Sequence, residues 1–298
     1  MIKFLMVLLA CIFAGLAYAT PPKDTAMLRQ NILTELAKQP QGHFAVAFKN
    51  LGTGETFFIN EHANFHAAST MKTPVLIETY RQAAAHKFAL SDSILVHTTF
   101  TSIYDGSSYI LDSASDSEKD LYFKAGTKLP ISELLFRMIT KSSNLATNLI
   151  IELVGAKNVL ATARAMGAKD IQVLRGVEDT KAFQHGMNNT VTAYDLALLF
   201  EQIAKGKAVG KKASDAMIDI LEQQFFRDVI PAKLPATVKV ANKSGSITGV
   251  CHDSGIVFLP DGRKYVVVLL SSDIPDYNAA ADILANVSKM LYDHVVAN

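Results

Sequence analysis

The chain contains little cysteine, with two residues among 298. Cys11 lies in an apolar segment at the N-terminus, so Cys251 is the one cysteine outside that segment. If the segment is removed, no intramolecular disulfide can form, even in an oxidising compartment. The fold must then be stabilised by its hydrophobic core. Hydrophobic residues make up 49% of the chain, which is enough to build one.

The chain also lacks an excess of charge of either sign. It has 29 Lys and Arg against 28 Asp and Glu, and without Lys3 the two counts are equal. This balance is not typical of proteins that bind nucleic acid, so we expect no such partner. No run of about 18 apolar residues follows the N-terminal segment, and we expect no membrane-spanning helix there. No glycine-rich phosphate loop is present, and no cofactor is implied.

Residues 1–19 have the pattern of a secretory signal peptide. Lys3 precedes an apolar run, which ends in the small-x-small sequence Ala-Tyr-Ala. We predict cleavage after Ala19, leaving one catalytic domain of residues 20–298 in the periplasm or outside the cell. Lipoprotein processing at Cys11 is the less favoured alternative. We expect a monomer without membrane contact after cleavage.

The hydrophobic period changes along the chain from strand to helix and back. Residues 43–51 and 55–60 read as strands, and three more follow Pro235. Most of 90–225 has helical spacing, apart from a polar stretch at 98–120 and a loop at 174–189. We therefore predict an α/β (α+β) fold. Its sheet comes from about 25–66 and 235–298, and its helical subdomain from about 67–234.

Three short motifs supply the chemistry. In chain order they are Ser69-Thr-Met-Lys72, Ser142-Ser-Asn144 and Lys243-Ser-Gly245. A serine hydroxyl is a weak nucleophile unless a neighbouring base takes its proton. Lys72 is three residues after Ser69, so on a helix the two side chains share a face. Each motif alone occurs by chance in many chains, and it is their combination in this order that is specific.

The three motifs resemble those of class A β-lactamases and of the wider penicillin-recognising serine hydrolases. The resemblance covers about residues 25–296. It implies a five-stranded antiparallel sheet flanked by helices, an all-helical subdomain, and a site in the cleft between them. It also implies that a small-molecule β-lactam is hydrolysed through an acyl-enzyme on Ser69, without a metal.

The resemblance assigns the acylation roles as follows. Ser69 attacks the lactam carbonyl, and its proton goes to Lys72 or, through water, to Glu178. The cation Lys243 would keep Lys72 close to neutral, because like charges lower the pKa of an amine. Ser142 passes a proton to the leaving nitrogen. The backbone N–H groups of Ser69 and Ser246 form the oxyanion hole.

Other residues would hold the substrate. Asn144 would bind its side-chain amide, and Lys243 and Ser244 its carboxylate. Tyr104 would flank the cleft entrance, unless it is a packing residue of its loop.

The chain departs from the class A pattern in the 174–189 loop. Class A enzymes have a glutamate two residues after the loop arginine, whereas Glu178 is three residues after Arg175. We predict Glu178 as the base that activates water for deacylation, with Asp179 as the fallback. The alternative for Glu178 is a surface carboxylate paired with Arg175. The second motif has Ser143 where class A has aspartate, and we expect this to remove structural support rather than chemistry.

Three rival functions remain open at this stage. A D,D-peptidase or other penicillin-binding serine hydrolase would acylate and then release its product slowly. A β-lactam sensor would acylate without turnover, but it would need a membrane link. A metal enzyme could use His62 and His66, which have i, i+4 spacing, although no second cluster of ligands lies nearby in the sequence.

Overall fold

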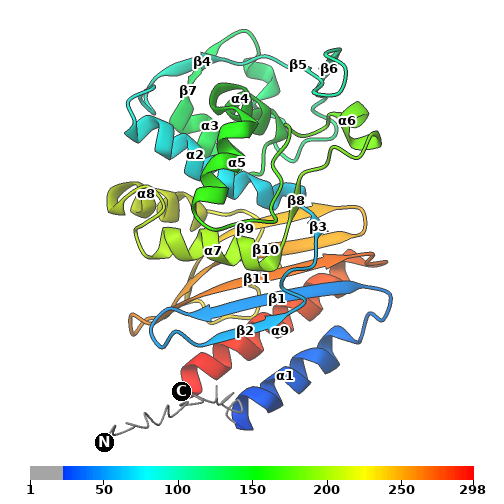
Figure 1. The fold of residues 1–298 in the computed structure, drawn as a ribbon, viewed down its shortest axis with the longest axis vertical. Helices are drawn as coiled ribbons and strands as arrows, with labels where there is room; N and C mark the ends of the chain where they lie inside the picture. Colours follow the sequence, from blue (N-terminus) through cyan, green and yellow to red (C-terminus); the bar gives the residue numbers. More distant parts are fainter. Residues whose placement is uncertain (1–22) are drawn as a thin grey trace, which may run out of the picture.

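A five-stranded antiparallel sheet forms the lower half of the molecule (Figure 1). The computed structural model describes residues 23–298, so the predicted signal peptide lies outside the described residues. The strand order is β2-β1-β11-β10-β9. The strands are β1 (His43–Asn50), β2 (Thr56–Ile59), β9 (Lys239–Ile247), β10 (Val250–Phe258) and β11 (Lys264–Ser272). The predicted fold class is confirmed.

Both faces of the sheet are covered, which explains why its central strands are apolar throughout. Successive side chains of a strand point to opposite faces. In β11, Val266 and Val268 belong to the hydrophobic core on one face, and Val267 and Leu269 to the core on the other. Three helices provide the cover in Figure 1: α7 (Ala193–Ala204) on the first face, and α1 (Lys23–Leu36) and α9 (Tyr277–Ala297) on the second.

The upper half is mainly helical (Figure 1). Its helices are η1 (Ala68–Met71), α2 (Lys72–Ala84), η2 (Tyr122–Lys124), α3 (Ile131–Thr140), α4 (Asn144–Val154), α5 (Ala156–Ala165), α6 (Thr180–Gln184) and α8 (Lys211–Leu221). Three short strand pairs accompany them: β3 (Phe65–His66) with β8 (Thr190–Val191), β4 (Ser93–Leu95) with β7 (Lys128–Pro130), and β5 (Thr99–Thr101) with β6 (Ser108–Ile110). Strands of two or three residues carry no detectable period, so the sequence did not predict these pairs.

The sheet meets the helical part along its edge strand β9, which packs against η1. The contact is close because β9 carries a glycine there. A Cβ atom on Gly245 would lie 3.0 Å from the backbone nitrogens of both Ser69 and Thr70. The glycine therefore lets the backbone of the third motif reach the backbone of the first.

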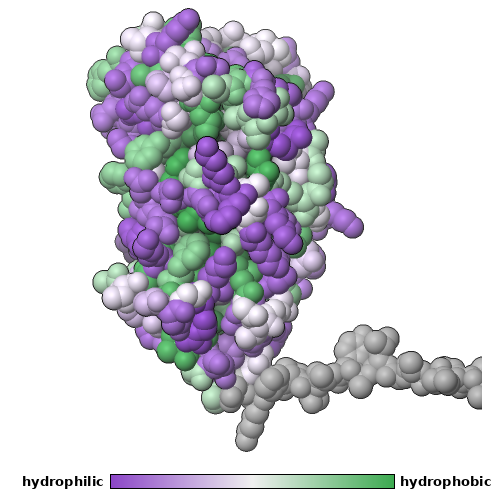
Figure 2. All heavy atoms as spheres, turned by 90° about the vertical axis from the view of Figure 1, so that its left-hand side faces the viewer, coloured by the Kyte–Doolittle hydropathy of each residue, from purple (hydrophilic) through white to green (hydrophobic). Residues whose placement is uncertain are grey.

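Polar and charged side chains dominate the face drawn in Figure 2, with apolar residues between them. Within residues 23–298, no single helix combines the length and apolar character that a bilayer crossing requires. The bent pair of α4 and α5 meets the test by length and composition alone.

Gly255→Ala tests how tightly the edge of the sheet is packed. A Cβ atom there would lie 2.5 Å from the carbonyl oxygen of Ala241 and 2.8 Å from the Cβ of Asn242. These atoms belong to β9 and cannot rotate away. We expect overpacking to lower the free energy of unfolding by about 1–3 kcal/mol, measured by chemical denaturation. The control is Gly52→Ala, where the nearest atom is the Asn50 side chain at 3.4 Å. Equal stability of the two variants would contradict this account.

Candidate active site

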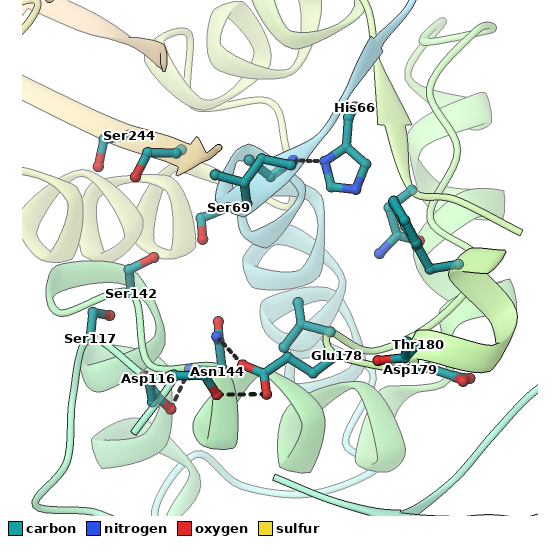
Figure 3. A pocket seen from close by; sticks show the side chains of 18 of the residues that line it. His66, Ser69, Asp116, Ser117, Ser142, Asn144, Glu178, Asp179, Thr180 and Ser244 are labelled. Carbon is teal, nitrogen blue, oxygen red and sulfur yellow. Dashed lines mark hydrogen bonds between the residues drawn. The ribbon is translucent and has the colours of Figure 1, made fainter. Parts of the chain in front are cut away.

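The three motifs meet at one pocket of about 630 Å³ (Figure 3). Its wall includes Ser69 from η1, Ser142 and Asn144 from the start of α4, and Ser244 to Ser246 from the end of β9. Segments 114–117 and 175–180 complete the wall on the helical side. Ser69 and Ser246, which lie 177 positions apart in the chain, therefore face one cavity.

Ser69 lies in the short helix η1, directly before α2. Ala68 before it has a φ of 43°, in the left-handed region that non-glycine residues rarely adopt. The N–H of Ala68 donates to Nδ1 of His66 over 3.1 Å. Burial and the nearby Arg175 guanidinium lower the pKa of His66, which favours the neutral ring that this hydrogen bond needs. His66 thus supports the strained turn that carries Ser69.

Lys72 is fully buried beside the second motif. Its Nζ donates to the backbone oxygen of Ser142, to Ser142 Oγ over 3.2 Å and to Asn144 Oδ1 over 3.1 Å. Burial lowers the pKa of Lys72 to about 7, against the opposing charges of Asp116 and Glu178. The direction of this shift is the one expected of Lys72, but its main cause is burial of the amine, whereas the sequence pointed to the Lys243 cation.

Ser142 Oγ lies between two buried amines. Lys243 Nζ donates to it over 3.2 Å, as Lys72 Nζ does from the other side. Burial, and then repulsion by Lys72, hold the pKa of Lys243 well below its usual range. A hydroxyl accepts at most two hydrogen bonds and donates one. Because both acceptor positions face amines, the Ser142 proton is free to point into the pocket, as a proton relay requires.

Asn144 connects the amine to the loop carboxylate. Its Oδ1 accepts from Lys72, and its Nδ2 donates to Glu178 Oε1 over 2.7 Å. The second carboxylate oxygen of Glu178 accepts from Ser115 Oγ over 2.9 Å. Figure 3 shows the Glu178 carboxylate beside Asn144, on the floor of the space into which Ser69 and Ser142 point. The shifted spacing in the loop therefore still brings a glutamate into the pocket.

Arg175 and Asp179 hold the loop in place. Arg175 donates to Met187 O, to Gly176 O and, over 3.5 Å, to Asn188 Oδ1. The Glu178 carboxylate accepts from Asn144 and Ser115, so it is not the partner of Arg175. Asp179 is buried and caps α6, and it accepts from Ser102 Oγ over 2.8 Å and from Ile103 N over 2.9 Å. Both oxygens of the Asp179 carboxylate, the fallback candidate for the base, therefore already accept hydrogen bonds within the protein.

Three side chains with large apolar parts also line the pocket: Phe226, Ile247 and Tyr277. Phe226 and Tyr277 lie outside the motifs, so no pattern in the sequence pointed to them.

Tyr104 lies away from the wall of this pocket. Its ring stacks on His185 with centroids 3.6 Å apart, and it is not one of the residues that line the cavity. This stacking joins the 102–107 loop to the end of α6, which is the packing role that the sequence left open.

The sequence also missed Asp116, which lines the pocket and is 4% exposed. It lies in the polar 98–120 stretch, where no motif or period singles it out. Its carboxylate accepts the backbone N–H groups of Asn144 and Leu145 at the start of α4.

The two histidines considered for metal binding have other partners. His62 stacks on Tyr194, and His66 accepts the Ala68 N–H. In the part of the chain that the structure describes, no group of three or more His, Cys, Asp or Glu residues is arranged to hold a metal ion.

Known proteins match the chain over nearly its whole length. The model of the "Beta-lactamase enzyme family" matches residues 27–295. Beta-lactamase VEB-1 of Pseudomonas aeruginosa is 21% identical, with 98% of both chains covered. Extended-spectrum beta-lactamase PER-1 of the same organism is 24% identical, with 80% of this chain and 78% of that protein covered.

A solved structure gives the same match in three dimensions. The beta-lactamase from Sphaerobacter thermophilus superimposes with a TM-score of 0.76 at 26% sequence identity. The match covers 90% of this chain and 98% of that one.

Asp179→Ala tests what holds the Glu178 loop. The substitution leaves the donors of Ser102, Ile103 and Ala182 without their acceptor. We expect a loss of more than about 2 kcal/mol in the free energy of unfolding, because each buried unsatisfied donor is costly. Hydrogen exchange in residues 175–187 should also become faster.

The control for this variant is Asp105→Ala, which removes the exposed Lys181–Asp105 ion pair between the same two loops. Surface ion pairs contribute little, so stability should barely change. A larger loss at Asp105 than at Asp179 would contradict the assignment.

Proposed function

The chain belongs to the β-lactamase enzyme family, whose members hydrolyse the amide bond of β-lactams, and we propose that this chain hydrolyses that bond through an ester on Ser69. The observation that carries this proposal is the Ser142 hydroxyl, held between the buried amines of Lys72 and Lys243 beside the nucleophile. An export signal at residues 1–19 would place the enzyme in the periplasm or outside the cell.

In acylation, Ser69 Oγ bonds to the lactam carbonyl carbon, and its proton passes to the Lys72 amine. A pKa of about 7 supports Lys72 in this role, because the base must be neutral near the working pH. The N–H groups of Ser69 and Ser246 stabilise the oxyanion. The C–N bond then breaks, Ser142 gives its proton to the nitrogen, and Lys72 restores it to Ser142.

In deacylation, Glu178 takes a proton from a water molecule that attacks the ester carbonyl. The ester C–O bond breaks, Ser69 regains its proton and the ring-opened acid leaves. The support for Glu178 is its place in the pocket wall and the two hydrogen bonds that orient its carboxylate. Lys243, Ser244 and the second N–H of Asn144 would hold the substrate.

The first test mixes purified chain with a chromogenic cephalosporin and follows colour and intact mass together. We expect many turnovers per molecule with little mass increase, and neither signal in Ser69→Ala. One equivalent of colour with a lasting adduct would instead identify a penicillin-binding peptidase that releases its product slowly. Wild-type protein that gives neither colour nor adduct would overturn the proposal.

Glu178→Gln tests the second half-reaction. The amide keeps the size of the side chain but cannot take a proton from water. We expect kcat to fall by about 100-fold or more, and a Ser69 adduct to accumulate in the mass spectrum. Glu152→Gln is the matched control, because Glu152 is exposed and pairs with His97 away from the pocket. Unchanged turnover in Glu178→Gln would remove Glu178 from the mechanism.

A further inference from the structure

The N-terminus of α4 is held by a carboxylate that comes from outside its motif. The first four N–H groups of a helix lack partners within the helix. In α4 these groups belong to Ser143, Asn144, Leu145 and Ala146. The N–H of Ser143 donates to the backbone oxygen of Arg137, and that of Ala146 donates to Ser143 Oγ. The other two, from Asn144 and Leu145, go to Asp116 Oδ2 over 2.9 and 3.0 Å.

Asp116 is itself fixed in place. It is buried, and its Oδ2 also accepts from Tyr122 OH over 3.0 Å, while its Oδ1 accepts from Glu118 N over 3.0 Å. The carboxylate is therefore part of the framework around the pocket. A negative charge at this position also suits the positive end of the helix dipole.

The neighbours of Asp116 bind other parts of the same site. Ser115 Oγ donates to Glu178, and Ser117 Oγ donates to the backbone oxygen of Lys141 over 2.7 Å. Glu118 forms an ion pair with Arg137 of α3. Four consecutive residues, 115–118, thus bind the Glu178 loop, the start of α4 and the end of α3, although none of them belongs to a motif.

We propose that Asp116 is a positioning residue for the Ser69 site: its carboxylate holds the backbone of Asn144, and so sets where Ser142 and Asn144 meet Lys72. Asn144 binds Lys72 through Oδ1 and Glu178 through Nδ2, so a shift at its backbone moves the contacts of both. The carboxylate supplies from a distant loop the charge that the second motif lacks at Ser143.

The charge of Asp116 gives this role a signature that simple packing would not have. Three charged groups interact with Lys72. The carboxylates of Asp116 and Glu178 raise the pKa of Lys72, and repulsion between the two amines lowers the pKa of Lys243. Removing the Asp116 charge alone lowers the pKa of Lys72 further. The amine is then neutral at a lower pH, and the ascending limb of the rate profile moves to lower pH.

The test is Asp116→Asn, and it rests on the proposed function for its main readout. In the wild type we expect kcat/KM for a chromogenic cephalosporin to rise with pH around 7. In the variant we expect kcat to fall by about tenfold or more, since small misplacements of reacting groups are costly. The limb should also move to lower pH. Asp120→Asn, an exposed carboxylate of the same loop, should leave both unchanged.

A second variant distinguishes loss of positioning from loss of the fold. Asp116→Asn combined with Ser143→Asp returns a carboxylate to the start of α4, and we expect it to recover most of the lost kcat. An unchanged kcat and pH limb in folded Asp116→Asn would overturn the proposal. So would a folded double variant that stays as slow as the single one.

The same series is measured with a sulfonyl fluoride, which loses fluoride as Ser69 Oγ bonds to its sulfur. This reaction needs the base but not lactam hydrolysis. If the wild type is sulfonylated at Ser69 but leaves the cephalosporin intact, the proposed function fails while the Asp116 prediction is still tested by the sulfonylation rates and their pH limb.

Discussion

The arrangement on which the site depends is the burial of two amines around one hydroxyl. Lys72 and Lys243 are both fully buried, and both donate to Ser142 Oγ. Burying a charge without a partner is very unfavourable, and an amine in that position gives up its proton instead. The low pKa of Lys72 is therefore a consequence of where the fold places the amine.

Carboxylates around the two amines limit this effect. Asp116 and Glu178 oppose the fall in the pKa of Lys72, and Asp253 opposes it in Lys243. Asp253 is buried as well, and burial raises its pKa to about 7, although hydrogen bonds from Asn242 and Ile230 favour the charged form. The site is thus a buried network in which each charge depends on its neighbours, so the pair of lysines cannot be understood from the motifs alone.

The sequence predicted those parts of the site in which the chemistry is local. Ser69 and Lys72 are three residues apart, and the apolar strands around Lys243 have a clear period, so both could be read from the chain. The contacts of Asp116 and Asp179 could not, because they join residues 28 and 77 positions apart in loops without any period. Glu178 is intermediate, since the loop and its glutamate were predictable. Its hydrogen bonds to Asn144 and Ser115 depend on how the loop folds back.

Three of the six non-glycine residues with a positive φ among residues 23–298 lie in the wall of the pocket. Ala68, Ser142 and Glu178 have φ values of 43°, 57° and 61°, and such conformations cost about 1–3 kcal/mol each in non-glycine residues. Glycine would relieve this strain, but at Ser142 and Glu178 it would remove the hydroxyl and the carboxylate. At Ala68 no side-chain chemistry is lost, yet glycine would also free the turn that presents Ser69. At these three pocket positions glycine would therefore remove a side chain or loosen the turn at Ser69. The other three residues, Asn60, His86 and Asp273, lie outside the pocket wall.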